Sequence, residues 1–453
     1  MPAPAVAGRR VDVGAVIDRR PIGRLQIGAF ACCLLSLIMD GFDVQALGYA
    51  APAIVRDWNI PNSALGPVFG AANFGVLIGA LTFSVVADRI GRRPVLIGAT
   101  LFFSVATLLT AQAGSIRSLL VLRFISGIGL GCIVPNASAL VGEYSPARLR
   151  VTLVMGITVG FTAGAAIGGF IAAALIPAFG WRSVFYFGGA IPLAIGLAMF
   201  VWLPESLQFM ALRGRDRARM IAWLHAIDPS VPTDPGTEYV VAETVRHGAP
   251  VAHLFRDGRA VVTLLLWVVN FMNLLNLYSL ASWLPTVVRD AGYSTSTAVL
   301  VGAILQTGGT IGTFGLAWLV SRWGFVRALS GSFAIASISI AAIGQPGLSL
   351  AFLYLIVFIA GWCIVGSQPG INAFAATYYP TSLRSTGVGW GLGIGRMGAI
   401  VGPIIGGQFM QWQWSTHDMF LAAAAPAAVS AVAMAALRGF VSPRDGVRRT
   451  SDV

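Results

Sequence analysis

Long apolar stretches alternate with short polar segments along the whole chain. About 20 apolar residues in a helix cross a hydrocarbon core of about 30 Å, and twelve such windows can be placed. They cover residues 27–50, 66–87, 95–113, 118–141, 151–177, 184–203, 260–284, 298–320, 326–344, 348–370, 386–408 and 417–438. Only helices and closed barrels satisfy their own backbone hydrogen bonds in lipid, so this pattern predicts an all-α, polytopic membrane protein.

The longest polar stretch, residues 204–259, divides the spans into two sets of six. It contains the run "RGRDRAR" and the pairs Asp228-Pro229 and Asp234-Pro235. Charged, proline-containing sequence of this kind is typical of a linker. The predicted organisation is a cytoplasmic N-terminal segment (1–26), a six-helix bundle (27–203), a cytoplasmic linker (204–259), a second six-helix bundle (260–438) and a cytoplasmic tail (439–453).

The two halves resemble each other in sequence. The loop "ADRIGRRP" at 87–94 is echoed by "VSRWGFVR" at 320–327. The matching pairs are Gly91 and Gly324, Asn136 and Asn372, Tyr144 and Tyr378, and Pro146 and Pro380. A parallel repeat of this kind predicts two pseudo-symmetric bundles with a binding site between them.

Positive charge lies in short segments on one side of the predicted membrane. All 30 basic residues are arginine, and the formal net charge is +12. Arginine-rich segments precede span 1 and follow spans 2, 4 and 6, whereas the loops on the opposite side of the predicted membrane contain few arginines. Cytoplasmic loops are enriched in arginine, so both termini are predicted to be cytoplasmic in a multi-pass protein of the cell (inner) membrane. This distribution argues against a nucleic-acid partner, and the polar first 26 residues argue against a cleaved signal peptide.

Residue types that enzyme chemistry needs are missing or lie outside the spans. The chain has no lysine, which excludes a P-loop ATPase. All four cysteines lie within predicted spans, whereas His225, His247 and His253 lie outside them and His417 is at the edge of the last span. The sequence shows no metal-ligand spacing or nucleophile–base arrangement. We therefore expect no enzymatic activity, no metal and no cofactor, and an ion gradient or a partner protein as the source of energy.

Four ionisable side chains lie deep inside the predicted spans. Asp40 and Asp43 share one face of span 1, Arg123 of span 4 lies near the depth of Asp43, and Arg396 of span 11 lies near the depth of Asp40. A charge at this depth costs roughly 3 kcal/mol to insert and usually marks a path for ions or substrate.

We assign proton coupling to Asp40 and Asp43, because a carboxyl group in an apolar setting can exchange its proton near the working pH. Arg396, and as second choice Arg123, offers a planar fork of donors that would bind a carboxylate if the substrate carries one. The alternative is that the four charges form ion pairs that only fix helix packing.

Uncharged polar and aromatic side chains of the second half are further candidates for substrate contact. Asn270, Asn273 and Asn276 recur every three residues in span 7 and are predicted to form one polar stripe facing the pore. Besides the arginines, the predicted substrate-binding residues are Asn273, Gln306, Gln368, Asn372 and Trp390. For Trp390 the prediction is a wall on which a ring could stack if the substrate carries one. The alternatives are hydrogen bonding between helices for the amides and packing for the tryptophan.

Several stretches resemble the major facilitator superfamily. "ADRIGRRP" resembles its signature loop between spans 2 and 3, and "RFISGIGLG" at 123–131 resembles its span-4 signature. Within the superfamily the chain is similar to the aromatic acid:proton symporters, through "DGFDVQALGYAAP" at 40–52 and "GVGWGLGIGRMGAIVGPIIGG" at 387–407. The resemblance implies proton-coupled uptake of a small aromatic carboxylate across the lipid bilayer, by alternating access of two six-helix bundles.

The resemblance also implies a gate at the signature loop. Asp88, Gly91 and Arg92 are the predicted gating residues. Asp88 would contact the positive end of a neighbouring helix and nearby arginines, a contact of about 0.3–1 kcal/mol that suits a reversible latch. The alternative is that the arginines of this loop only set the membrane orientation.

Other functions share parts of this pattern. A proton-coupled transporter of a non-aromatic organic acid would have the same fold. So would a drug:proton antiporter, although that family's usual Gly-Pro in span 5 is missing from "GFTAGAAIGGF" at 160–170. A non-transporting nutrient receptor would normally carry a long signalling extension, whereas about 15 residues follow Arg438. Accumulation, expulsion or chemical change of a labelled substrate separates these functions.

Overall fold

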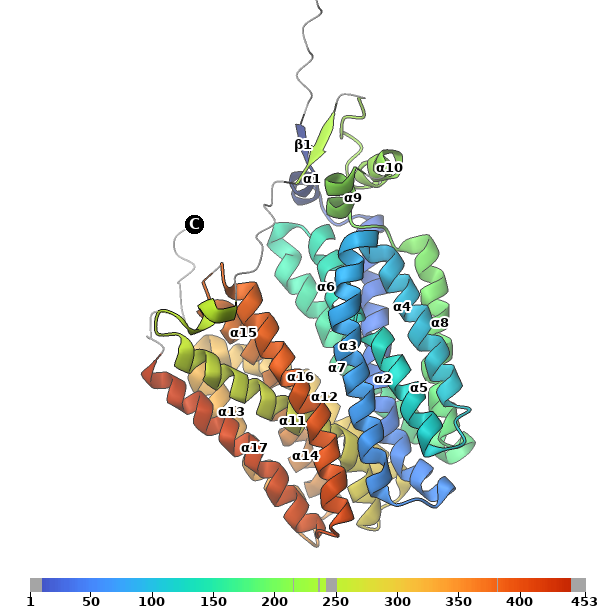
Figure 1. The fold of residues 1–453 in the computed structure, drawn as a ribbon, viewed down its shortest axis with the longest axis vertical. Coiled ribbons are helices and arrows are strands. Elements are labelled where there is room, and N and C mark those ends of the chain that lie inside the picture. Colours follow the sequence, from blue (N-terminus) through green and yellow to red (C-terminus); the bar gives the residue numbers. More distant parts are fainter. Residues whose placement is uncertain (1–9, 215, 235–236, 242–250, 381, 441–453) are drawn as a thin grey trace, which may run out of the picture.

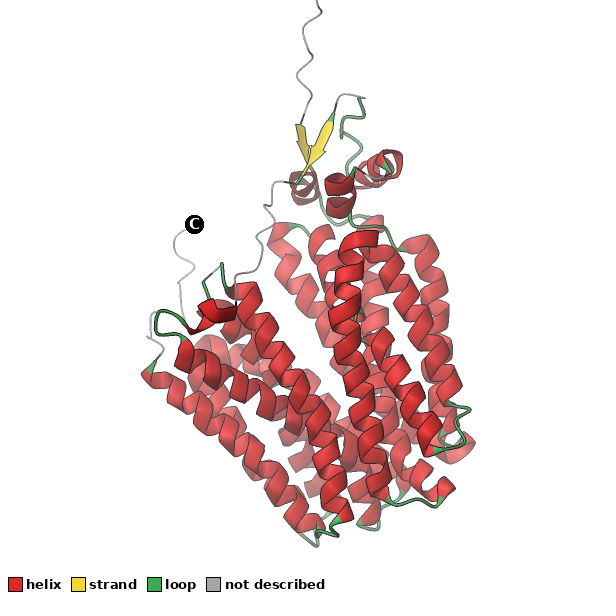
Figure 2. Cartoon of the chain, in the orientation of Figure 1, coloured by secondary structure: helices red, strands yellow, loops and turns green. Residues whose placement is uncertain are grey.

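Twelve helical stretches among the described residues are long and apolar enough to span a membrane, which confirms the predicted all-α architecture. The structure, a computed structural model, describes residues 10–214, 216–234, 237–241, 251–380 and 382–440. Six spans form an N-terminal bundle, the N half, and six form a C-terminal bundle, the C half, which lies beside it (Figure 1, Figure 2). Residues 1–9 and most of the predicted tail 439–453 lie outside the described residues.

Each half contains a fourth span that is made of two helices. The N half comprises α2 (Arg24–Trp58), η1 (Asn62–Leu65) with α3 (Gly66–Ile90), α4 (Arg92–Thr110), α5 (Ile116–Leu130) with α6 (Ile133–Tyr144), α7 (Ala147–Phe179) and α8 (Arg182–Trp202). The C half, preceded by η2 (Val251–Phe255), comprises α11 (Ala260–Asp290), α12 (Thr295–Trp323), α13 (Phe325–Ile343), α14 (Leu350–Ile364) with α15 (Ser367–Tyr378), α16 (Arg384–Gln411) and α17 (Thr416–Ala436) with η3 (Leu437–Gly439). The interruption between α5 and α6 thus recurs between α14 and α15.

The backbone repeats at the second loop of each half as well. Gly91 joins α3 to α4 with a φ of 110°, and Gly324 joins α12 to α13 with a φ of 78°. Glycine adopts positive φ without steric cost, which explains why both turns use it. The internal repeat predicted from the sequence is therefore present in the backbone.

The first span is longer than its apolar window. The window covers 27–50, whereas α2 has 35 residues and measures about 52 Å at 1.5 Å per residue. Arg24 and Arg56, near its two ends, are exposed. Long arginine side chains can place their charge outside the hydrocarbon while the helix continues, so apolar length alone underestimates the helix.

Glycines let α2 pack tightly against α7 beside the buried carboxylates. A Cβ atom on Gly41 would collide with the carbonyl oxygen of Phe161, and one on Gly164 would collide with that of Ile38. Small residues allow such close backbone approach between membrane helices. Asp40 and Asp43 therefore lie on a helix whose position is fixed by backbone contact.

The N-terminal segment and part of the linker fold together as a small cap on the N half. The cap comprises β1 (Arg10–Asp12), α1 (Val13–Arg19), α9 (Leu207–Arg213), α10 (Arg217–Ile227) and β2 (Glu238–Val240), and it lies at the top of Figure 1. β1 pairs in parallel with β2, and the Arg20 guanidinium donates to Asp228 Oδ1 at 2.7 Å. We call this end of the molecule the cap end and the opposite end the far end.

The two halves meet at the far end. Asn62 Nδ2 donates to Asp290 Oδ2 at 2.6 Å, and Ser296 Oγ donates to the carbonyl oxygen of Ala173 at 3.1 Å. Toward the cap end the ribbons of the two halves diverge (Figure 1). The bundles are therefore joined on one side of the membrane and splayed on the other.

Candidate functional site

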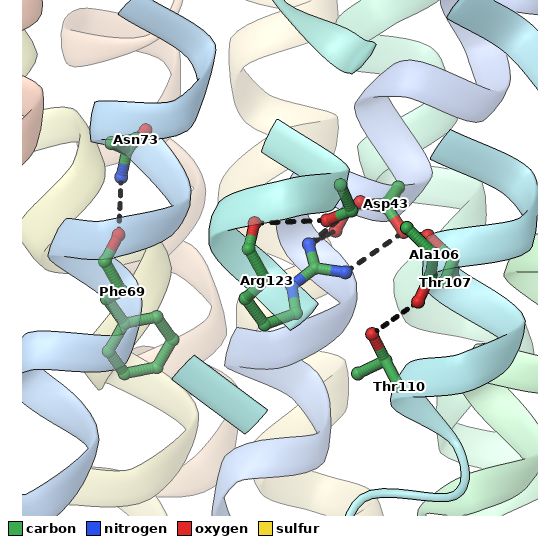
Figure 3. Close-up of polar contacts among 8 residues, drawn as sticks. Asp43, Phe69, Asn73, Ala106, Thr107, Thr110 and Arg123 are labelled. Carbon is green, nitrogen blue, oxygen red and sulfur yellow. Dashed lines mark hydrogen bonds and ion pairs between the residues drawn. The ribbon is translucent and has the colours of Figure 1, made fainter. Parts of the chain in front are cut away.

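An ion pair lies at the centre of the N half. Arg123 Nη2 is 2.8 Å from Asp43 Oδ2 and Nη1 is 3.1 Å from Oδ1, so the contact is bidentate (Figure 3). Arg123 also donates to the backbone carbonyl of Asp43 at 2.9 Å, and Thr107 Oγ1 donates to Oδ1 at 2.7 Å. The pair connects α2, α5 and α4, and the two predicted site residues do lie at one depth.

Further contacts enclose the guanidinium of this pair. The ring of Phe185 on α8 lies 5.7 Å from the Arg123 guanidinium carbon, a cation–π contact. Arg123 Nε has no hydrogen-bond partner. Most of the donors of Arg123 are therefore committed within the N half, which leaves it less free than Arg396 to bind a substrate.

Asp40 lies one turn of α2 closer to the cap end and has a different environment. Its side chain is only 3% exposed, and no hydrogen bond from the described residues reaches its carboxyl group. It is attracted electrostatically by Arg396 and repelled by Asp43. Asp40 therefore lies within the electrostatic influence of the Arg396 cation of the opposite half, without forming a direct ion pair with it.

Arg396 carries the corresponding charge of the C half. It lies on α16, is half-buried, and donates from Nη1 to the Tyr278 hydroxyl of α11 at 3.2 Å. Its other guanidinium nitrogens make no hydrogen bond within the described part of the chain. A carboxylate placed beside Arg396 would therefore find free donors and a neighbouring phenol.

Glutamines bridge the two halves beside a small central cavity. Gln45 Nε2 donates to the carbonyl oxygen of Ala281, and Gln306 Nε2 donates to Gln45 Oε1 at 3.2 Å. The cavity measures about 20 Å³, room for about one water molecule, and its polar walls include Gln45, Arg123 and Tyr278. The predicted site residue Gln306 thus contributes to the interface between the halves.

A network of amides links α11 to α15. Asn273 Nδ2 donates to Gln368 Oε1 at 2.7 Å, and Gln368 Nε2 donates to Asn270 Oδ1 at 3.2 Å. Asn273 Oδ1 is buried and has no partner, so it retains an acceptor. Asn372, half-buried on α15, lies one turn beyond Gln368.

One sequence expectation for the C half is wrong, and another stays a prediction. Asn276 does not continue the stripe of Asn270 and Asn273, because it lines a different cavity, between α11, α16 and α17. Trp390 is 45% exposed and stacks on Trp267 with a centroid distance of 5.9 Å. It lies toward the cap end and is absent from the walls of the central cavity, so a stacking role there would require movement of the halves.

The predicted gating residues are embedded in contacts of the N half. The Arg92 guanidinium pairs with Glu143 of α6 at 2.9 Å, while the backbone N–H groups of Arg92 and Arg93 donate to Glu205 Oε1. A Cβ on Gly91 would collide with the Glu205 carboxylate. Asp88 is exposed, and its backbone carbonyl accepts from Arg213.

Some residues of this arrangement were not anticipated from the sequence. Gln45 could have been found, since it is a polar residue inside an apolar span, five positions after Asp40. Tyr278 could also have been found, because it lies in mid-span and not in the interfacial belt where membrane tyrosines are usual. Thr107 could not have been found from the sequence, because a threonine inside a helix readily donates a hydrogen bond to a backbone carbonyl of its own helix. Among the described residues no cluster of His, Cys, Asp and Glu side chains offers a metal site.

Comparison with known proteins places this geometry in a family. The family model for the Major Facilitator Superfamily matches residues 33–361 and 266–452. The chain belongs to this superfamily. It is therefore a multi-pass membrane transporter and not an enzyme.

Relatives in the superfamily are similar over nearly the whole chain. The 4-hydroxybenzoate transporter PcaK of Pseudomonas putida is 39% identical over 97% of this chain and 98% of its own. A gallate transporter of Pseudomonas putida is 39% identical over 94% of this chain and 95% of its own. A crystal structure of a D-xylose-proton symporter superposes with a TM-score of 0.71 at 17% identity, covering 90% of this chain and 97% of that one, which supports the fold.

Proposed function

We propose that the chain is a proton symporter that takes up an aromatic carboxylic acid across the cytoplasmic (inner) membrane by alternating access. Both termini and the cap would then be cytoplasmic, in accord with the arginine-rich loops. One observation carries the proposal: Asp40 is buried near a bidentate ion pair of the N half and an incompletely bonded arginine of the C half.

The substrate class rests on relatives and on charge. The relatives named above are transporters of 4-hydroxybenzoate and gallate. Each of these acids combines a ring with a carboxylate. Arg396 offers the fork that fits the carboxylate, and Tyr278 beside it offers a hydroxyl.

Charge balance supplies a mechanism of coupling. The carboxylates of Asp40 and Asp43 balance the cations of Arg123 and Arg396 when the site is empty. A substrate carboxylate alone would leave one net negative charge in a buried site, and a proton alone would leave one net positive charge. Both imbalances are costly at low dielectric, whereas binding the two together restores neutrality. The balance favours one proton on Asp40 for each monocarboxylate on Arg396.

Movement between the halves would carry this site from one side to the other. The far end is joined and the ribbons diverge toward the cap end, the arrangement of a carrier open to the cytoplasm. Asp88, Gly91 and Arg92 would take part in closing the cap end in the opposite state. In this proposal Glu143 and Glu205 hold their loop in place on the N half.

Uptake in proteoliposomes tests the proposal. Labelled 4-hydroxybenzoate, gallate and benzoate are offered outside, with the outside more acidic, and the assay is repeated with a protonophore. We expect at least one acid to accumulate and the protonophore to abolish accumulation. Accumulation that persists in the presence of the protonophore would contradict symport. No uptake of any of the three acids by correctly inserted protein would contradict the substrate class.

A further inference from the structure

A second cavity lies outside the central site, in the C half. It is enclosed by α11, α16 and α17 and measures about 330 Å³, within the range of small-molecule sites. Its walls are almost wholly apolar and include the rings of Trp283, Phe409 and Phe420. Rim residues Ile405 and Val429 are exposed, so the cavity opens sideways between α16 and α17, toward the bilayer.

One unpartnered amide lies in this apolar wall. Asn276 is 0% exposed, and both its Nδ2 and its Oδ1 lack a hydrogen-bond partner. Buried amides are normally satisfied, because leaving both a donor and an acceptor unpaired is costly. Ser279, one turn further along α11, is the nearest other polar residue of the wall. The amide therefore indicates a ligand that both donates and accepts.

The walls also restrict the charge of such a ligand. None of the described side chains that line the cavity is charged. An ionised carboxylate would enter without a counterion, at a large desolvation cost. A neutral carboxyl group, in contrast, presents one hydroxyl donor and one carbonyl acceptor, which complement the carbonyl and NH2 of Asn276.

We propose that this cavity binds the undissociated form of an aromatic carboxylic acid, with its carboxyl group on Asn276 and its ring against Trp283 and Phe409. The choice of an aromatic acid rests on the proposed function. The site is separate from the central one, since Asn276 and Tyr278 lie on opposite sides of α11, about 200° apart. A lipid acyl chain would fill the volume but leave Asn276 unpaired.

Benzamide is the probe for the test, because it stays neutral at every working pH and presents the same donor and acceptor. Its binding to the full chain in lipid nanodiscs is measured by equilibrium dialysis, with empty nanodiscs subtracted. Toluene, which lacks both polar groups, is the matched ligand. We expect benzamide to bind at least tenfold more tightly than toluene, with an affinity independent of pH.

Variants locate the binding. Asn276→Leu keeps the side-chain size and should weaken benzamide binding at least tenfold. Ala422→Phe fills the cavity from α17 and should abolish benzamide binding although Asn276 is intact. Arg396→Gln removes the central cation and should leave benzamide affinity unchanged. In that background benzoic acid should bind less tightly by tenfold for each pH unit above its own pKa, following its neutral fraction.

Three results would overturn the inference. Unchanged benzamide affinity in Asn276→Leu would remove the amide from the site, and equal affinity for toluene would indicate an alkyl-binding groove only. Loss of benzamide binding in the Arg396→Gln variant would place the ligand in the central site. A protein that transports no aromatic acid but binds benzamide through Asn276 would refute the proposed function and retain the amide site.

Discussion

Arg123 holds Asp43 with two guanidinium nitrogens, and the side chains of the pair are only 1% and 0% exposed. Asp40, on the same helix, has no such partner. The two carboxylates that the sequence assigns jointly to proton coupling therefore differ in their surroundings. Asp43 is positioned to hold three helices together, and Asp40 is positioned to exchange a proton.

Asp43→Asn should destabilise the protein, because it leaves the buried Arg123 cation without a counterion. Removing one partner of a buried pair typically costs about 3–5 kcal/mol. The free energy of unfolding in mixed detergent micelles measures this loss. The double variant Asp43→Leu with Arg123→Met should recover much of the stability but no proton-driven uptake. Equal stability of Asp43→Asn and the parent protein would contradict the structural role.

Asp40→Asn should fold normally and uncouple transport. The amide resembles the protonated acid and cannot release a proton, so exchange of labelled for unlabelled substrate should continue while accumulation falls at least tenfold. Counterflow and gradient-driven uptake in the same liposomes measure the two activities. Asp57→Asn removes an exposed carboxylate from the same helix and is the control. Full accumulation by Asp40→Asn would be incompatible with the coupling role.

Arg396→Lys should weaken substrate binding although it keeps the charge. Lysine cannot form the planar two-donor contact, so we expect KM for the acid to rise about tenfold with a smaller change in kcat. Arg322→Lys, at an exposed arginine stacked on Trp318, is the matched control. The assignment fails if both variants show the same KM.

Asp88→Asn should slow turnover without changing substrate affinity. Its carboxylate is exposed in the state described, and its contacts at helix ends would form only when the cap end closes. Initial uptake rates at saturating substrate give the turnover, and equilibrium binding gives the affinity. A parent-like rate would show that this loop serves orientation alone.

The cap should loosen at acidic pH. Hydrogen bonds from Arg20 and Ser230 hold the pKa of Asp228 well below its usual range. Because the folded pKa is lower than the unfolded value of about 3.9, the pair contributes fully above about pH 4 and is lost as the pH falls through the folded pKa. Hydrogen-exchange protection of β1 should be constant from pH 7 to pH 5 and should fall as the pH drops below about 4.

Removing the carboxylate should have a similar effect at neutral pH. Asp228→Asn should lower the protection of β1 several-fold, because the charge-assisted bond to Arg20 is weakened. Asp257→Asn removes an exposed carboxylate that pairs with Arg259 outside the cap, and it should leave the protection of β1 unchanged. Protection that survives Asp228→Asn would mean that strand pairing alone holds the cap.

Depth along a helix could be predicted from the sequence, but rotation about its axis could not. Depth follows from the rise per residue, which is why Asp43 and Arg123 were expected at one level. Rotation depends on packing. Each three-residue step turns a helix by about 300°, so Asn276 lies about 120° away from Asn270 and reaches another cavity.

The cap also could not be predicted from the pattern of apolar and polar residues. Its strands have three residues each and are separated by more than 200 positions, so Arg10 and Glu238 carry no periodic signal that would pair them. The twelve spans, in contrast, are long and strongly apolar. Membrane crossing is thus encoded locally, whereas the cap depends on contacts that only the folded chain creates.

The hydrogen bonds of the cap also determine with which half of the molecule it moves. Its described hydrogen bonds run within itself and to the N half, as in the contact from the Ala147 N–H to Asp18. A fluorophore on α10 would therefore travel with the N half as one rigid body. Paired with a second dye on α17, it would turn the rocking of the two halves into an optical signal, without any label in the substrate path.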